Sequence, residues 1–83
     1  TIHQLGPADV PRMRAVNALF AEAFEDRASY ADSPPTDAYL SALLAKDHVI
    51  VIVAEYGGGV AGALTAYVLD KLEQDRREIY IYD

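Results

Sequence analysis

The sequence predicts a small α+β domain with the order β-α-α-β-β-β and a mostly antiparallel sheet. A hairpin is the first basis of that prediction. Residues 48–56, HVIVIVAEY, are apolar and rich in β-branched side chains, which is typical of a buried strand covered on both faces. The three glycines at 57–59 favour a turn, because glycine adopts positive φ without steric cost. Residues 60–69, VAGALTAYVL, form the second apolar arm.

The first part of the chain predicts a short strand followed by a helix. Residues 2–5 alternate between apolar and polar side chains, and Gly6-Pro7 ends that strand. Asp9 is suited to cap a helix that runs to about Phe24, and Pro11 lies in its first turn, where a missing N–H does no harm. Apolar side chains recur along it at three- and four-residue spacing: Val10, Met13, Val16, Phe20 and Phe24.

A loop at residues 25–35 separates this helix from a second one, because Pro34-Pro35 cannot continue a helix. Thr36 or Asp37 is suited to cap the second helix. Its apolar face consists of Tyr39, Leu40, Leu43 and Leu44. After the hairpin, a polar connection leads to a last strand at residues 78–83. No internal boundary interrupts the chain, so we expect residues 1–83 to lie in one domain.

The composition limits the kinds of partner. Thirteen acids and seven bases give the 83 residues a net charge of -6. Nucleic acids and anionic membranes are bound through Lys and Arg, so this charge argues against both. It permits a cationic ligand, although solubility is the simpler interpretation. Cys is absent, which excludes disulfides and fits a reducing compartment.

Acidic residues gather where the first helix ends. A helix C-terminus carries partial negative charge, so each acid there costs about 0.3–1 kcal/mol. The acids at this helix end are Glu22, Glu25 and Asp26, and Asp32 follows in the loop. Tyr30 lies among these acids in the sequence. Carboxylates that pair with ammonium groups, beside an aromatic ring, suit a polyamine or an amino sugar. A solvated helix end is the alternative interpretation.

The last strand places tyrosines beside acids. Strict alternation divides it into two faces, one with Glu78, Tyr80 and Tyr82 and the other with Ile79, Ile81 and Asp83. A carboxylate at the end of a strand, in a partly apolar cleft, is suited to act as a general base toward an amine. An acid that begins a turn is the structural alternative.

The sequence gives no sign of a metal site. It contains no HExxH, CxxC or GxSxG motif and no phosphate-binding loop. His3 and His48 are far apart in the chain, and we expect each to be a surface or core histidine and not a ligand or a base.

The order of elements and several stretches resemble the N-terminal half of the GNAT superfamily of N-acetyltransferases. They look closer still to the aminoglycoside 3-N-acetyltransferases that modify gentamicin-type antibiotics. The stretches are LGPADVPRMRAVNALFAEAF at 5–24, DAYL at 37–40 and GALTAYVLDKLEQDRREIYIYD at 62–83. The resemblance covers nearly the whole chain, and residues 66–83 are its most specific part.

The resemblance implies acetyl transfer from acetyl-CoA to the 3-amino group of the deoxystreptamine ring, by a cytoplasmic, homodimeric resistance enzyme. It implies that Asp83 accepts a proton from the substrate ammonium and that Tyr82 lines the same end of the strand. The acids that would attract and orient the polycationic substrate are Glu22, Glu25, Asp26, Asp32 and Glu78.

One part of the family pattern is missing. Members of the superfamily continue after this strand with a loop of the pattern R/Q-x-x-G-x-G/A, whose backbone amides hold the CoA pyrophosphate. The 83 residues contain no such loop, so we assign no acetyl-CoA-binding residue. The pattern of the last strand also predicts a sheet edge with no strand paired to it. We therefore expect the remainder of the GNAT domain in a further segment or a separate chain, and the 83 residues alone to be inactive.

Two alternative functions stay open. One is a GNAT enzyme that acts on another amine, such as a polyamine or a protein N-terminus. The other is a non-catalytic binding or dimerisation module, whose last strand pairs with a partner by strand addition.

Overall fold

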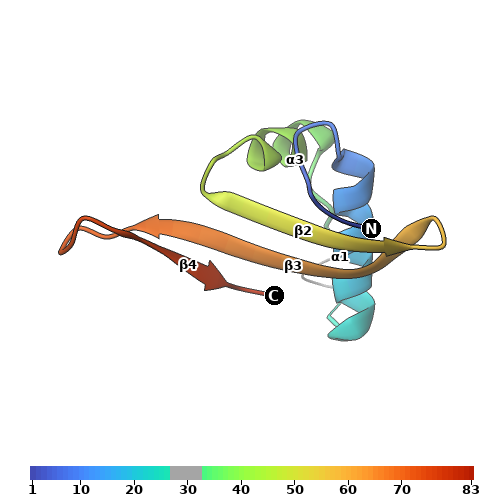
Figure 1. The fold of residues 1–83 in the computed structure, drawn as a ribbon. Helices are drawn as coiled ribbons and strands as arrows, with labels where there is room; N and C mark the ends of the chain where they lie inside the picture. The colour runs from blue at the N-terminus through green and yellow to red at the C-terminus, as the bar shows by residue number, and fades with distance from the viewer. Residues whose placement is uncertain (27–32) are drawn as a thin grey trace.

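The described residues form a four-stranded antiparallel sheet with two helices packed against it (Figure 1). The structure, a computed structural model, describes residues 1–26 and 33–83. The elements are β1 (Ile2–Gln4), α1 (Val10–Ala23), α3 (Asp37–Leu44), β2 (Val49–Tyr56), β3 (Gly59–Asp70) and β4 (Arg77–Ile81). The strands lie in the sheet in chain order, and each neighbouring pair is antiparallel. The predicted α+β class and element order are confirmed.

The turn between β2 and β3 consists of two glycines. Gly57 and Gly58 have φ values of 63° and 83°, and positive φ at both central residues is what a type I′ turn requires. A β-bulge follows, because Ala54 pairs with Gly62 while Glu55 pairs with Val60. Bulges change the direction of the side chains beside them. Glu55 reaches α1 and β1 from this place.

The core lies between the helices and one face of the sheet. It is made by α1, α3 and β2 and includes Met13, Val16, Phe20, Leu40, Leu44, Val49, Val51 and Val53. Alternation along β2 places every second side chain in this core. Ile50 and Ile52, on the opposite face, are only half-buried. The sequence predicts that β2 is covered on both faces. In the described structure, only the face toward the helices is fully covered.

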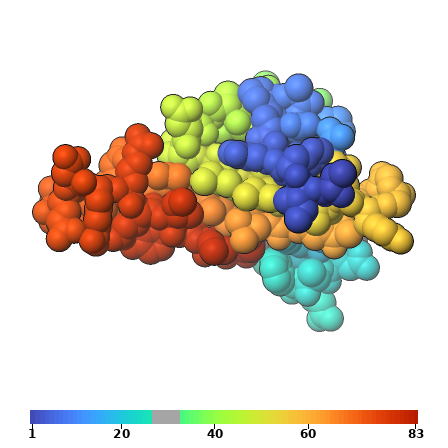
Figure 2. Space-filling model, in the orientation of Figure 1, coloured from blue at the N-terminus to red at the C-terminus, as the bar shows by residue number. Residues whose placement is uncertain are grey.

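The β3–β4 hairpin extends beyond the helices (Figure 1), and its end projects from the body of the molecule in Figure 2. β4 is one of the two edge strands of the described sheet. Its Ile79 and Ile81 pair with Val68 and Ala66 and are exposed. The described strand ends at Ile81, two residues earlier than predicted.

The two helices begin differently. The hydroxyl of Thr36 accepts a hydrogen bond of 3.1 Å from the Tyr39 N–H, so Thr36 caps α3. The carboxylate of Asp9 does not cap α1. It accepts a hydrogen bond of 2.7 Å from the N–H of Gly6 instead, and so stabilises the turn before the helix.

Arg14 joins the two helices. Its guanidinium donates to the carbonyl of Pro35 at 3.0 Å and forms an ion pair with the carboxylate of Asp37. Pro35 and Asp37 flank the capping residue of α3, so α1 carries the side chain that fixes the start of the second helix.

An ion-pair cluster connects β1, α1 and β2. Arg12 donates to Glu55 from its Nε at 3.0 Å and to Asp9 from its Nη1 at 2.9 Å. Nε2 of His3 lies 2.5 Å from Oε1 of Glu55. The hydrogen bond from Gly6, together with Arg12, lowers the pKa of Asp9. Desolvation raises the pKa of Glu55, but Arg12 and His3 outweigh it and leave that pKa below its ordinary value.

This cluster predicts a loss of stability in acid. A carboxylate whose pKa is lower in the folded than in the unfolded chain contributes stability above the unfolded pKa, and the contribution disappears as the pH falls through the folded pKa. We expect the urea midpoint to be constant above about pH 5 and to fall below about pH 4. In the Glu55→Gln variant, the urea midpoint should fall less steeply as the pH is lowered. An identical acid dependence in the variant would exclude Glu55 as a contributor.

No helix among the described residues is long and apolar enough to cross a membrane. Within residues 1–26 and 33–83, no group of three or more His, Cys, Asp or Glu is arranged to hold a metal ion.

Candidate functional site

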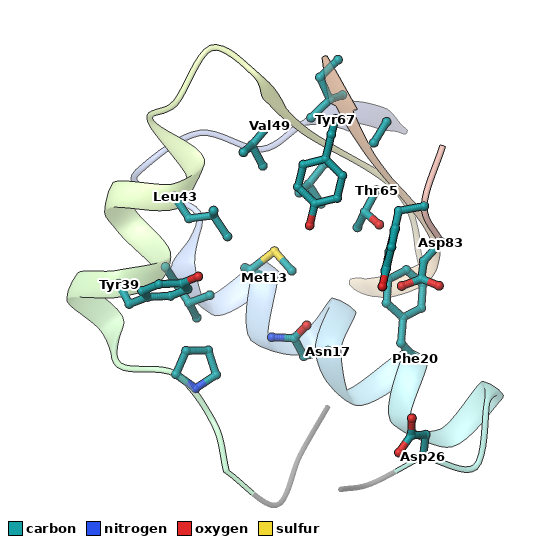
Figure 3. Close-up of a pocket in the computed structure, with 16 residues that line it drawn as sticks. Met13, Asn17, Phe20, Asp26, Tyr39, Leu43, Val49, Thr65, Tyr67 and Asp83 are labelled. Carbon is teal, nitrogen blue, oxygen red and sulfur yellow. The ribbon is translucent and has the colours of Figure 1, made fainter. Parts of the chain in front are cut away.

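A cavity of about 500 Å³ opens between the two helices and the sheet (Figure 3). Cavities of this size hold small organic ligands. Its apolar walls come from α1, α3 and β2, through Met13, Leu43 and Val49. Polar and aromatic groups come from β3 and from the residues that follow β4. The cavity therefore combines an apolar surface with polar side chains at its edges.

Asp83 and Tyr82 both line this cavity. The Tyr82 N–H donates to the carbonyl of Thr65 at 2.8 Å, and the Thr65 N–H donates to the carbonyl of Asp83 at 2.9 Å. Strict alternation would put Asp83 and Tyr82 on opposite faces, and that expectation is wrong. The regular strand ends at Ile81, so alternation no longer fixes the directions of the two residues beyond it.

The ring of Tyr82 packs against β3. Its centroid lies 5.8 Å from that of Tyr67, with the rings at 80° to each other. Edge-to-face pairs of this kind contribute about 0.5–1.5 kcal/mol beyond their buried area. The contact fixes the aromatic wall beside Asp83.

Asp26 also lines the cavity, from the end of α1 (Figure 3). Its N–H donates to the carbonyl of Ala21 at 3.0 Å, so the chain turns back at the helix end. Glu25 has a φ of 53° in this turn and is exposed, as is Glu22, and neither lines the cavity. Of the acids predicted from the helix end, the cavity brings Asp26 together with Asp83. Tyr30 and Asp32, also predicted there, lie outside the described residues.

Glu78 lies in the β3–β4 hairpin and does not line the cavity. Its carboxylate accepts hydrogen bonds from the Tyr80 hydroxyl at 2.9 Å and from Arg76 at 2.6 Å, and Nζ of Lys71 lies 3.7 Å away. The hydrogen bond from Tyr80, followed by the charge of Lys71 and the hydrogen bond from Arg76, lowers the pKa of Glu78. Its carboxylate is thus engaged with side chains of the hairpin itself.

Sequence reasoning missed four polar residues of the cavity: Asn17, Tyr39, Thr65 and Tyr67. One signal was available for Asn17. It follows Met13 by four residues and precedes Phe20 by three, so a polar amide stands on the face of α1 that the apolar pattern assigns to the core. The other three have no such signal, because tyrosine and threonine are common on strands and helix surfaces.

The sequence matches no family model and no curated protein. Solved structures do match it. An aminoglycoside acetyltransferase from an uncultured soil metagenomic sample is 44% identical with a TM-score of 0.96, over 100% of this chain and 55% of that protein. A second one, also from an uncultured soil metagenomic sample and in complex with sisomicin, is 31% identical with a TM-score of 0.88, over 100% of this chain and 53% of that protein.

A more distant match is the ribosomal-protein-alanine N-acetyltransferase of Brucella melitensis biovar Abortus 2308. It is 22% identical with a TM-score of 0.62, over 99% of this chain and 57% of that protein, and it supports the fold alone. The chain spans about half the length of the solved structures it matches. The predicted resemblance is confirmed: over its whole length, the chain has the fold of aminoglycoside acetyltransferases of the GNAT superfamily.

Proposed function

We propose that these residues form the acceptor-binding part of an N-acetyltransferase that moves acetyl from acetyl-CoA to the 3-amino group of aminoglycosides. The observation that carries the proposal is the 44% identity, over the whole chain, to a solved aminoglycoside acetyltransferase. The second neighbour, in complex with sisomicin, supports an aminoglycoside as acceptor. In this proposal residues 1–83 are part of a GNAT domain, and the remainder of that domain binds the CoA pyrophosphate.

The wider role follows from the same resemblance. Acetylation of an aminoglycoside neutralises an ammonium group, so the proposed enzyme confers antibiotic resistance. It acts in the cytoplasm, where acetyl-CoA is made, and as a homodimer.

The cavity supplies chemistry that suits this reaction. An aminoglycoside carries several ammonium groups, and the two carboxylates of the cavity, on Asp26 and Asp83, can pair with two of them. The net charge of -6 attracts such a cation from a distance. We propose that Glu25, Tyr30 and Asp32 also take part in binding the acceptor, and of these three only Glu25 is among the described residues.

Asp83 is the proposed general base. An ammonium must lose a proton before its nitrogen can attack, and a carboxylate within about 2.6–3.2 Å can accept that proton. Tyr82, at the same end of the sheet, would orient the acceptor ring. Acetyl-CoA supplies the acetyl group, and none of the described residues forms the glycine-bearing loop that would hold its pyrophosphate. We propose no binding role for Glu78, because its carboxylate is held in the hairpin.

Acetyl transfer by the protein expressed from its complete gene tests the proposal. With gentamicin as acceptor, NMR of the product should place one acetyl group on the 3-amino nitrogen. Acetylation of a polyamine or a protein N-terminus, with gentamicin unmodified, would favour the alternative acceptors. If no acetyl group were transferred to any of these acceptors, the result would favour a non-catalytic module.

Asp26→Asn should raise KM for gentamicin about 10-fold and change kcat much less. The carboxylate would pair with an ammonium that does not react, so it would stabilise the bound substrate and the transition state equally. A 10-fold change corresponds to about 1.4 kcal/mol, the lower end for a charged hydrogen bond. Steady-state kinetics measure it.

Asp75→Asn is the matched control, since it removes the same charge from an exposed residue of the β3–β4 hairpin that does not line the cavity. If Asp26→Asn and Asp75→Asn had the same KM for gentamicin, the Asp26 carboxylate would contribute to solubility and not to substrate binding.

A further inference from the structure

Asn17 stands out as a polar residue on the face of α1 that packs toward the sheet. Met13 and Phe20, on the same face, are buried in the core, while Asn17 is half-buried. Its side chain lines the cavity, and its amide points toward the cavity centre (Figure 3). No hydrogen bond joins this amide to any other described residue.

An asparagine in this position is unfavourable for folding alone. Asparagine is a weak helix former, and an amide can make up to four hydrogen bonds, which a partly apolar wall does not provide. A leucine in its place would extend the apolar stripe of the helix. The amide therefore has hydrogen-bonding capacity that a bound molecule can use.

Two neutral polar groups face Asn17 from the sheet. Thr65 and Tyr67 pair with Val51 and Val49, whose side chains are in the core, so both project from β3 on the side of the helices. Figure 3 shows their hydroxyl groups across the cavity from the Asn17 amide. Neither hydroxyl makes a hydrogen bond within residues 1–26 and 33–83.

We propose that Asn17, together with Thr65 and Tyr67, binds the hydroxyl groups and ring oxygens of the acceptor and so determines specificity for a hydroxylated ring. This inference rests on the proposed function and deepens it. Carboxylates alone bind a flexible polyamine as well as an amino sugar, because both carry ammonium groups. Neutral donors and acceptors distinguish the two, since only the sugar has hydroxyl groups to fill them.

Calorimetric binding of gentamicin and spermine to the protein from its complete gene tests the inference. Spermine carries the ammonium groups without hydroxyl groups. In Asn17→Leu, which keeps the size and removes the amide, gentamicin should bind about 10-fold more weakly, as expected for the loss of a good hydrogen-bonding group. The Kd of spermine should change less than about 2-fold, because the carboxylates that bind ammonium groups remain.

Thr65→Val provides a second, independent variant. It keeps the β-branched shape and removes one hydroxyl on the opposite wall of the cavity. It should weaken the binding of gentamicin about 3- to 5-fold and leave the binding of spermine unchanged. Thermal unfolding of both variants should match or exceed that of the original protein, since neither removes a core contact.

The results separate this inference from the proposed function. Unchanged gentamicin binding in both variants, or equal weakening of gentamicin and spermine, would overturn it, as would failure of the original protein to bind gentamicin. Selective weakening would support it even in a protein that transferred no acetyl group, because binding is measured without the reaction. In that case the proposed function alone would fail.

Discussion

Asp83→Asn should lower kcat for acetylation of gentamicin at least ~100-fold, the usual scale for loss of a general base. Asparagine has the size of aspartate but cannot accept the proton of the ammonium. The backbone hydrogen bonds that place residue 83 beside Thr65 do not involve its side chain, so these hydrogen bonds can form in the variant too. Substrate pairing at Asp26 also remains, so KM should change less than kcat.

A matched variant gives an independent test of Asp83. Asp75→Asn, with the same change in charge, should keep the rate. Full activity of Asp83→Asn would remove Asp83 from the mechanism, whichever acceptor the enzyme uses.

Leu40→Ala should lower the free energy of unfolding by about 2–5 kcal/mol. Leu40 is 2% exposed and lies in the core that α3 forms with α1 and β2. Truncation removes its buried surface and leaves a cavity that the surrounding strands cannot close. A whole domain is stable by about 5–15 kcal/mol, so the loss is a large share of the total. The urea midpoint should fall while the m-value stays constant.

Tyr39→Ala is the control on the same helix, because the neighbouring Tyr39 is 59% exposed. It should change the stability by less than about 0.5 kcal/mol, as exposed substitutions do. Equal losses in the two variants would contradict the orientation of α3.

The fold could be predicted because its signals are local. The β-branched run of β2, the two glycines of the turn and the apolar spacing of α1 each specify their own element. The end of the last strand could not be predicted from such patterns. Tyr82 and Asp83 are placed by hydrogen bonds to Thr65, which is distant in the sequence, and a regular alternation gives the wrong direction for Asp83.

The lining of the cavity could be predicted in part. Asp83 and Tyr82 were proposed from the resemblance and Asp26 from the unusual acids at a helix end, and all three line the cavity. Their roles stay predictions. Thr65 and Tyr67 were missed as site residues because their role depends on α1 crossing β3, which is a tertiary arrangement. Glu78 shows the converse: a carboxylate on a strand fits a ligand site or an ion pair equally well in sequence, and the structure gives it partners within the hairpin.

The cavity and the core share part of their walls, and this limits how the protein can diversify. Met13, Phe20 and Leu40 line the cavity and are also core residues. Mutations that enlarge the cavity at these places sacrifice folding stability. Tyr39 is exposed and Asn17 half-buried, so they can be exchanged with little such loss. Evolution toward new acceptors would therefore proceed through these two positions, while the core residues next to them on the same helices stay fixed by the requirement to fold.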